Sequence, residues 1–339
     1  MELTNKCNAR CPGCTRTVDG DTHPFLKANQ LQWTLDEFSS LLPPEVIDNK
    51  EFTFGGTVDD PLMNTNIVSI VEYILDNNGE VEIFTNTGAN TKETFSKLGK
   101  LSKKTNRLRV TFSVDGLKDT NHLYRVNVKW EKVLENMKAY LQQKGKAKWE
   151  YLVFEHNIKD VDDAKKLAND LGVKLVLRQN IRNTHSWISK TKAKEEGKIV
   201  TKEFEVKPTK EYEHPEISKA NELTGKSNVT KDEGRSIKCH LYHNKTVFVD
   251  WNQRVWPCCW WATDNFLGHE YFHMLTDKFG DKWNSLKHNS WNDILGHTYY
   301  SFLLRESWNG QSSEYYNSNC FKQCGDNASR QSYKKEQVN

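Results

Sequence analysis

The chain lacks several features that would assign it to a common class of protein. It has no run of eighteen apolar residues, so no transmembrane helix is expected. Its N-terminus has no basic stretch followed by an apolar one, so no secretion signal is expected. Lys and Arg number 48 against 45 Asp and Glu, and a formal net charge of +3 gives no electrostatic argument for a nucleic-acid partner. A cytoplasmic protein without a membrane partner is therefore expected.

A fourth cysteine is missing from the most informative part of the chain. Cys7, Cys11 and Cys14 have the spacing C-x3-C-x2-C and follow the short segment Met1–Thr4. Structural zinc sites and structural iron–sulfur clusters normally take four protein ligands. Three thiolates on one tight loop can hold three corners of a cubane cluster and leave the fourth iron open to a small molecule. The loop therefore predicts a metal centre with a free position, and so an enzyme. In a chain without a secretion signal, clustered cysteines favour metal ligation over disulfides.

The first half of the chain predicts an α/β fold, because short β-branched runs alternate with helical patterns. Thr34 and Glu37 form a capping-box signature at one helix start. Strands are expected at residues 2–4, 51–54, 81–85, 108–114, 148–154 and 173–177, and helices at 34–42, 67–75, 92–101, 133–141 and 161–171. Strands joined by crossover helices are parallel, which predicts an open or partly closed barrel of the partial (β/α)6, TIM-like type. Active sites of such folds lie at the carboxyl ends of the strands, where the cysteine loop follows the first strand.

Further motifs follow the other expected strands. The second strand leads into Phe54-Gly-Gly-Thr-Val-Asp-Asp-Pro-Leu62, and the third ends in Thr85-Asn-Thr-Gly88. The fourth ends in Ser113-Val-Asp-Gly116, which is followed by Tyr124-Arg125. Together with the cysteine loop, these motifs resemble the radical S-adenosylmethionine (SAM) family.

The resemblance implies a 4Fe–4S cluster on Cys7, Cys11 and Cys14, with SAM bound to the open iron. It implies reductive cleavage of SAM to a 5′-deoxyadenosyl radical, which abstracts a substrate hydrogen, and a one-electron donor such as flavodoxin or ferredoxin. The implied cofactor-binding residues are Gly56, Asp60, Ser113 and Arg125, of which the arginine fork suits the SAM carboxylate.

Two positions depart from the family pattern. Asp59 stands where a second glycine is usual. The residue before the third cysteine is commonly bulky or aromatic and packs near the adenine, but here it is Gly13. The adenine contact must therefore come from elsewhere.

The barrel is expected over residues 1–182, and residues 183–238 are expected to be a polar linker or surface excursion. Residues 190–238 carry twelve basic and ten acidic side chains and show no sustained period. The interleaved signs leave no polycationic patch.

Residues 239–339 are expected to be a small cysteine-rich auxiliary domain. The segment Val247-Phe-Val-Asp-Trp-Asn-Gln-Arg-Val-Trp-Pro-Cys-Cys259 resembles SPASM and twitch domains, the C-terminal extensions of radical SAM enzymes that bind auxiliary iron–sulfur clusters. Gln253 stands in place of the usual glycine, and we expect the turn to form through Trp251-Asn252, because Asn tolerates the left-handed conformation.

The remaining cysteines suffice for one further cluster. Its four expected ligands are Cys239, Cys258, Cys320 and Cys324, which makes a second, auxiliary 4Fe–4S cluster the first choice and zinc the runner-up. Cys259 is left over, and we favour a buried small hydrophobe over an alternative ligand.

The sequence thus predicts a radical SAM enzyme of oxidoreductase or transferase type. By resemblance the leading substrate is a peptide or protein side chain. The alternatives are a small molecule or nucleoside as substrate, or a non-catalytic metal-binding scaffold for peptides. The substrate and the oligomeric state are not legible, and the short lead into Cys7 hints that the true start lies upstream.

Overall fold

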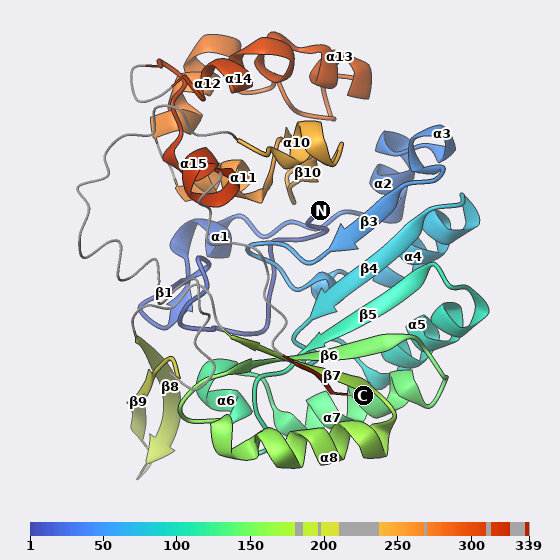
Figure 1. Cartoon of the computed structure of the whole chain (residues 1–339), viewed down its shortest axis with the longest axis vertical. Helices are drawn as coiled ribbons and strands as arrows, with labels where there is room; N and C mark the ends of the chain where they lie inside the picture. Colours follow the sequence, from blue (N-terminus) through green and yellow to red (C-terminus); the bar gives the residue numbers. More distant parts are fainter. Residues whose placement is uncertain are drawn as a thin grey trace. The chain divides into compact units, whose positions relative to one another are not determined.

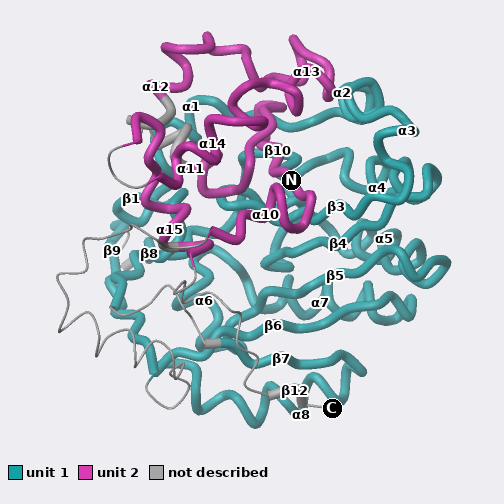
Figure 2. Tube along the Cα trace, turned by 45° about the horizontal axis from the view of Figure 1, so that its top comes forward, with its two compact units in different colours: residues 1–213, 333–339 teal, residues 214–332 magenta. Residues whose placement is uncertain are grey.

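The computed structural model describes residues 1–179, 186–195, 198–209, 237–267, 270–309, 313–325 and 336–338. The chain divides into two compact units, which Figure 2 colours differently. The first unit contains residues 1–213 and 333–339, and the second contains residues 214–332. The division at residues 213 and 214 falls inside the polar segment that separates the two cysteine sets.

The first unit is built on a sheet of six strands in the order β12-β7-β6-β5-β4-β3 (Figure 1). Five of them are parallel, and the short C-terminal β12 adds antiparallel to β7. Their bounds are β3 Glu51–Phe54, β4 Glu80–Thr85, β5 Leu108–Ser113, β6 Ala147–Val153, β7 Lys174–Gln179 and β12 Glu336–Val338. The prediction of an α/β fold with parallel strands from residue 51 onward is confirmed, with bounds that shift by one or two residues.

The predicted first strand, residues 2–4, is wrong as a strand. The segment makes only an isolated bridge between Thr4 and Gln32. The carbonyl of Leu3 is occupied by other donors, since Trp33 N donates to it at 2.9 Å and Asn64 Nδ2 at 2.8 Å. The segment nevertheless runs beside β3, because the amino group of Met1 donates to the carbonyl of Thr53 at 2.7 Å. The parallel sheet therefore has five strands rather than six.

Helices cover the outer side of the curved sheet (Figure 1). The predicted helices are all present, and the capping box of Thr34 and Glu37 forms as expected. Their bounds are α2 Leu35–Leu41, α4 Ile67–Asp76, α5 Lys92–Lys104, α7 Trp130–Leu141 and α8 Val161–Leu171. Shorter turns of helix are α1 Pro24–Ala28, α3 Pro44–Ile47, η1 Pro61–Met63, α6 Asn121–Tyr124 and η2 Ile158–Asp160.

Large aromatic side chains fill the space between sheet and helices. Phe112 of β5 meets Tyr140 of α7 edge-on at 5.6 Å, and both are fully buried. Trp149 of β6 is also fully buried, and its indole N–H donates to the carbonyl of Val114 at 2.8 Å. Burying one such ring removes about 150–250 Å² from water, an upper bound of about 4–6 kcal/mol. This core holds the carboxyl ends of β5 and β6 in place.

Two hairpins lie outside this sheet. β1 Thr17–Val18 and β2 Asp21–Thr22 follow the cysteine loop directly. β8 Trp187–Glu195 and β9 Lys198–Val206 pair antiparallel along their whole length. The polar linker or surface excursion expected over residues 183–238 thus contains an antiparallel hairpin at residues 187–206, whereas residues 210–236 lie outside the described residues. Backbone hydrogen bonds pair the two strands along the ladder, and most of the described β9 side chains face solvent, which explains the absent hydrophobic period.

The second unit consists of short helices around a small hairpin. Its elements are α10 His240–His243, β10 Phe248–Val249, β11 Val255–Trp256, α11 Cys259–Leu267, α12 Glu270–Phe279, α13 Trp291–Gly296, η3 Tyr299–Leu303, α14 Leu304–Glu306 and α15 Ser318–Cys324. Trp283 is packed among Trp256, Tyr299 and Tyr300, with ring centroids 5.0–6.3 Å apart. Aromatic packing of this kind gives a small unit much of its core.

The turn of hairpin β10–β11 differs from the expectation. The left-handed residue is Gln253, with φ of 63°, rather than Asn252. Asp250 closes the turn, because its carboxylate accepts from the backbone N–H groups of Asn252 at 2.8 Å and Arg254 at 3.0 Å. The chain therefore reverses at residue 253, and Gln253 adopts the conformation that glycine would favour.

No helix in the described part of the chain is both long and apolar enough to cross a membrane.

Candidate functional site

The three N-terminal cysteines lie at the carboxyl ends of the central strands. Cys14 Sγ donates to the carbonyl of Thr57, in the loop after β3, at 3.7 Å. Asn86 Nδ2, directly after β4, donates to Cys7 Sγ at 3.6 Å. Arg125 Nη1, in the segment after β5, donates to Cys11 Sγ at 3.8 Å. Each cysteine is thus met by a residue from a different strand end.

Backbone hydrogen bonds hold the cysteine loop in a compact turn. Cys14 N donates to the carbonyl of Cys11 at 3.0 Å, and Arg10 N donates to that of Val126 at 3.0 Å. The three cysteines are free thiols. Burial raises the pKa of Cys7 well above its ordinary value and that of Cys11 to about 11, although Arg125 opposes the shift at Cys11. The thiols of Cys7 and Cys11 are therefore protonated at neutral pH, and binding of a metal releases protons.

Asp60 links the loops after β3 and β4. Its carboxylate accepts from Leu62 N at 3.0 Å, from Asn86 N at 2.7 Å and from Thr85 Oγ1 at 3.0 Å, and the residue is 3% exposed. Burial raises its pKa, whereas the three donors oppose the shift. The predicted cofactor-binding acid thus also fixes Asn86 beside Cys7.

Gly56 is required because the Glu2 side chain occupies the adjacent space. A Cβ at position 56 would lie 2.0 Å from Glu2 Cγ and 2.2 Å from Glu2 Oε1. Glu2 Oε1 itself accepts from Thr57 N at 2.8 Å, Thr57 Oγ1 at 3.0 Å and Val58 N at 3.0 Å. Glu2 was not among the residues predicted from the sequence, although an acid that opens an otherwise apolar strand pattern is a usable signal.

Asp59 is a half-buried acid of this loop, and one of its carboxylate oxygens has no partner among the described residues. Its Oδ1 accepts from Gly56 N at 2.8 Å, whereas the buried Oδ2 has no hydrogen-bond partner among the described residues. Burial, together with the nearby Glu2 carboxylate, raises the pKa of Asp59 well above its ordinary value. A buried, unpartnered acceptor is the kind of group that a cationic ligand can satisfy.

Ser113, Asp115 and Arg125 come from the end of β5 and the segment that follows it. Ser113 ends β5 and is half-buried. Asp115 is almost fully buried; it accepts from Arg125 Nε at 2.6 Å and from Leu152 N at 2.7 Å. Burial opposes the charge of Arg125, but Asp115 and Cys11 outweigh it and raise the pKa of the guanidinium. Asp115 therefore aims a permanent cation at the cysteine loop.

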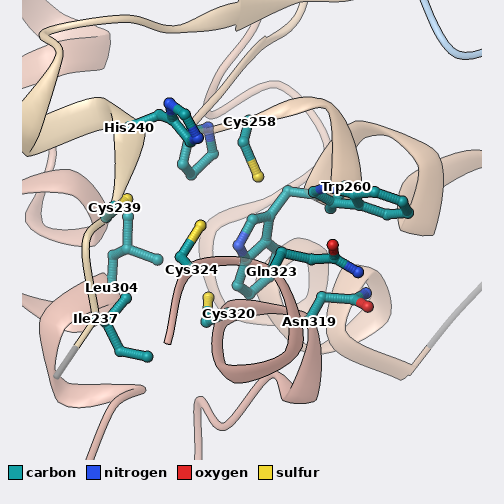
Figure 3. Close-up of a pocket in the computed structure, with 12 residues that line it drawn as sticks. Ile237, Cys239, His240, Cys258, Trp260, Leu304, Asn319, Cys320, Gln323 and Cys324 are labelled. Carbon is teal, nitrogen blue, oxygen red and sulfur yellow. The ribbon is translucent and has the colours of Figure 1, made fainter. Parts of the chain in front are cut away.

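In the second unit the four predicted cysteine ligands line one pocket (Figure 3). Lys238 N donates to the carbonyl of Cys324 at 2.8 Å, which places Cys239 beside α15. Cys320 and Cys324 lie one helical turn apart on α15, and Cys258 directly precedes α11. Figure 3 shows the sulfurs of Cys258, Cys320 and Cys324 turned into this space. Cys259 is half-buried and does not belong to the lining.

The lining of this pocket brings thiols together with an apolar wall. Burial raises the pKa of Cys239 and Cys258, and raises that of Cys320 to about 12. Gln323 Oε1 is buried against the pocket without a hydrogen-bond partner in the described part of the chain. Trp260 and Trp261 also line the pocket and contribute to its apolar wall. Within the described residues, no three His, Cys, Asp or Glu side chains are gathered closely enough to share one metal ion.

Solved structures resemble this chain in fold at low sequence identity. A structure of native anSMEcpe with bound AdoMet and Cp18Cys peptide is 14% identical, with a TM-score of 0.52 over 99% of this chain and 90% of that one. A histidine-tagged form of anSMEcpe with bound AdoMet is 14% identical, with a TM-score of 0.51 over 88% and 77%. Streptococcus suis SuiB bound to precursor peptide SuiA is 12% identical, with a TM-score of 0.48 over 79% and 60%. At this sequence identity the two anSMEcpe structures show a shared fold alone.

No curated protein matches the chain in sequence. The family model of the Radical SAM superfamily matches residues 1–168, which contain the cysteine loop and strands β3 to β6. Membership in this superfamily implies an enzyme that uses SAM and a 4Fe–4S cluster. Residues 1–168 therefore form a Radical SAM superfamily domain.

Proposed function

We propose that the protein cleaves SAM reductively and abstracts a hydrogen atom from a peptide or protein side chain. One observation carries the proposal: three cysteines on one loop each meet a residue from a different strand end, and side chains of two of those residues donate to the sulfurs of Cys7 and Cys11. When bound, the cluster supplies the single electron that splits SAM. The electron itself comes from a donor such as flavodoxin or ferredoxin.

Cys7, Cys11 and Cys14 hold the cluster in this proposal, and individual donors beside Cys7 and Cys11 oppose the rise in thiol pKa that burial causes. Asn86 Nδ2 and the backbone N–H of Ala9 both donate to Cys7 Sγ, the latter at 3.4 Å. Arg125 faces Cys11 with a positive charge. Hydrogen-bond donors and cations aimed at sulfur stabilise ligated thiolates and tune a cluster.

Gly56, Asp60, Ser113 and Arg125 form the proposed SAM site. Because Nε of Arg125 donates to Asp115, the terminal guanidinium nitrogens are the ones that would bind the SAM carboxylate. The Ser113 hydroxyl, at the end of β5, would bind the ribose. Asp60 acts mainly by holding the loop, and the open Oδ2 of Asp59 supplies an acceptor for the SAM ammonium group.

The second cysteine set would hold an auxiliary 4Fe–4S cluster in a SPASM- or twitch-like domain. The four cysteines of one pocket support this assignment, and Cys259 stands outside the lining. Zinc is the runner-up for the same thiolates. An iron–sulfur cluster here would accept an electron or anchor the substrate.

A peptide substrate is supported by the solved structures of anSMEcpe that contain bound peptides, Cp18Cys in one and Kp18Cys in another. Their likeness to this chain is one of fold, so the substrate remains part of the proposal.

The test is anaerobic reconstitution with iron and sulfide, reduction with dithionite, and quantification of 5′-deoxyadenosine formed from SAM. The control is the triple variant Cys7→Ala, Cys11→Ala, Cys14→Ala. Cleavage no greater than in this control would refute the proposal and favour a non-catalytic metal-binding scaffold. Iron and sulfide counting on the same triple variant should still find about one 4Fe–4S cluster; zinc in its place would overturn the auxiliary assignment.

A further inference from the structure

Gly13, between Cys11 and Cys14, marks a place where two distant segments of the first unit meet. A Cβ at position 13 would lie 2.6 Å from both Cη2 and Cζ2 of Trp187 and 2.8 Å from its Cζ3. Contacts this short leave no room for any other side chain unless the indole moves. Trp187, the first residue of β8, therefore occupies the space that a side chain at position 13 would fill.

The indole continues into a row of aromatic rings beside the cysteine loop. Trp187 stacks on Tyr124 with ring centroids 6.4 Å apart and planes 26° apart. Tyr124 in turn packs on Phe154 at 4.7 Å, and the Arg125 guanidinium lies 5.4 Å from the Tyr124 ring. Tyr124 and Phe154 are buried, whereas Trp187 is partly exposed. Trp187 is thus the accessible end of this row.

The hairpin that carries Trp187 is attached to the domain. Glu155 N donates to the carbonyl of Lys207 at 3.1 Å, and Phe154 forms a bridge with Pro208. Phe204 of β9 meets His156 edge-on at 5.4 Å. These contacts hold the stem of the hairpin at the carboxyl end of β6, so the position of Trp187 is set by packing.

We propose that Trp187 is a specificity-determining residue of the SAM site, whose indole forms the aromatic surface on which the adenine packs. The inference rests on the proposed function. The proposed SAM site surrounds the cysteine loop, and Gly13 lies in that loop, so the indole against Gly13 provides an aromatic surface next to this site. Base–aromatic stacking is worth about 1–3 kcal/mol per base, enough to decide between a nucleoside cofactor and one without a base.

The test measures binding of radiolabelled SAM to the cluster-loaded full chain by anaerobic equilibrium dialysis, with 5′-deoxyadenosine and methionine as separate competitors. Trp187→Ala should weaken SAM and 5′-deoxyadenosine about tenfold each. It should leave methionine unchanged, because methionine has no base. Ile199→Ala, which alters a 75% exposed residue of the same hairpin, is the control and should bind like the wild type.

A double variant that moves the aromatic ring from position 187 to position 13 provides a second test. Gly13→Phe alone clashes with the indole, whereas Gly13→Phe combined with Trp187→Ala returns an aromatic ring to the same space. The double variant should therefore bind SAM more tightly than either single variant. Trp187→Leu keeps an apolar side chain without a π face; it should lose about fivefold in SAM affinity and remains informative if the alanine variant folds poorly.

The outcomes separate this inference from the proposed function. Wild-type SAM affinity in Trp187→Ala or Trp187→Leu would overturn it. An equal loss for methionine and 5′-deoxyadenosine would also overturn it, since Trp187 would then only support the loop. If the wild type, with its cluster verified by iron and sulfide content, bound no SAM at all, the proposed function itself would fall.

Discussion

Replacing Gly56 by alanine tests why the loop after β3 has its present path. The new Cβ would lie 2.0–2.5 Å from three atoms of one side chain, Glu2 Cγ, Oε1 and Cδ. Glu2 is 1% exposed and cannot move outward without leaving its hydrogen bonds. The substitution therefore forces either the loop or Glu2 out of place.

The size of the effect follows from what Glu2 holds. Its Oε1 accepts from Thr57 N, Thr57 Oγ1 and Val58 N at 2.8–3.0 Å. Hydrogen bonds to a charged group contribute about 1.5–3 kcal/mol each, but they are not additive. Overpacking of a tight site costs about 1–3 kcal/mol. We expect Gly56→Ala to destabilise the protein by about 3–5 kcal/mol.

A double-mutant cycle isolates this contact. Glu2→Ala removes both the clash and the hydrogen bonds, so adding Gly56→Ala to it should change stability by less than about 1 kcal/mol. The free energies of unfolding come from urea titrations of the metal-free protein followed by circular dichroism, fitted to the transition of the first unit. If Gly56→Ala costs the same with and without Glu2, the contact with Glu2 does not explain the glycine and the reasoning is refuted.

Three further predictions concern single residues. Asp115→Asn leaves the largely buried Arg125 without its charged partner and should lower the stability of the first unit by about 3 kcal/mol and SAM affinity at least tenfold; unchanged SAM dialysis would contradict this. Gln253 is buried, so Gln253→Gly and the control Gln253→Ala both lose its packing, but the glycine variant should have the higher thermal midpoint because it relieves about 1 kcal/mol of left-handed strain; equal midpoints would reject the explanation. Burial lowers the pKa of His156 to about 4, so the unfolded chain binds its proton more readily than the native state does. Stability should therefore fall by about 2 kcal/mol between about pH 6.5 and 4, and His156→Phe, measured by urea titration across that range, should remove this component; an unchanged pH profile would refute it.

The regular part of the fold was readable from the sequence because local signals and tertiary packing agree there. Hydrophobic periods and caps such as Thr34 predicted the helices, and β-branched runs predicted β3 to β7. The segment of residues 2–4 had the same β pattern, yet it forms no strand, because the Leu3 carbonyl accepts hydrogen bonds from Trp33 N and Asn64 Nδ2. The strands of the hairpin at residues 187–206 were not predicted, because most of the described β9 side chains face solvent and leave no hydrophobic period.

The site was readable where chemistry depends on residue type and spacing. The motif residues Gly56, Asp60, Ser113 and Arg125 stand at strand ends or in the segments after them, as the pattern predicted. The cysteine loop contacts the same edge of the sheet, although residues 2–4 form no strand. The partners of these residues were not readable, since Glu2, Asn86 and Trp187 reach the site from other segments. The turn at Gln253 was also misplaced, because Asp250 decides where the chain reverses.

The sequence by itself determined the residue types and their spacing: three cysteines in C-x3-C-x2-C spacing predict a metal centre that is one ligand short. Only the tertiary structure decided which groups stand around that centre. Burial and donor geometry depend on contacts between segments far apart in the chain, and no local pattern encodes them. Trp187 and Gly13 are the clearest case. The indole fills the space that a side chain at position 13 would need, and only folding brings these two residues together.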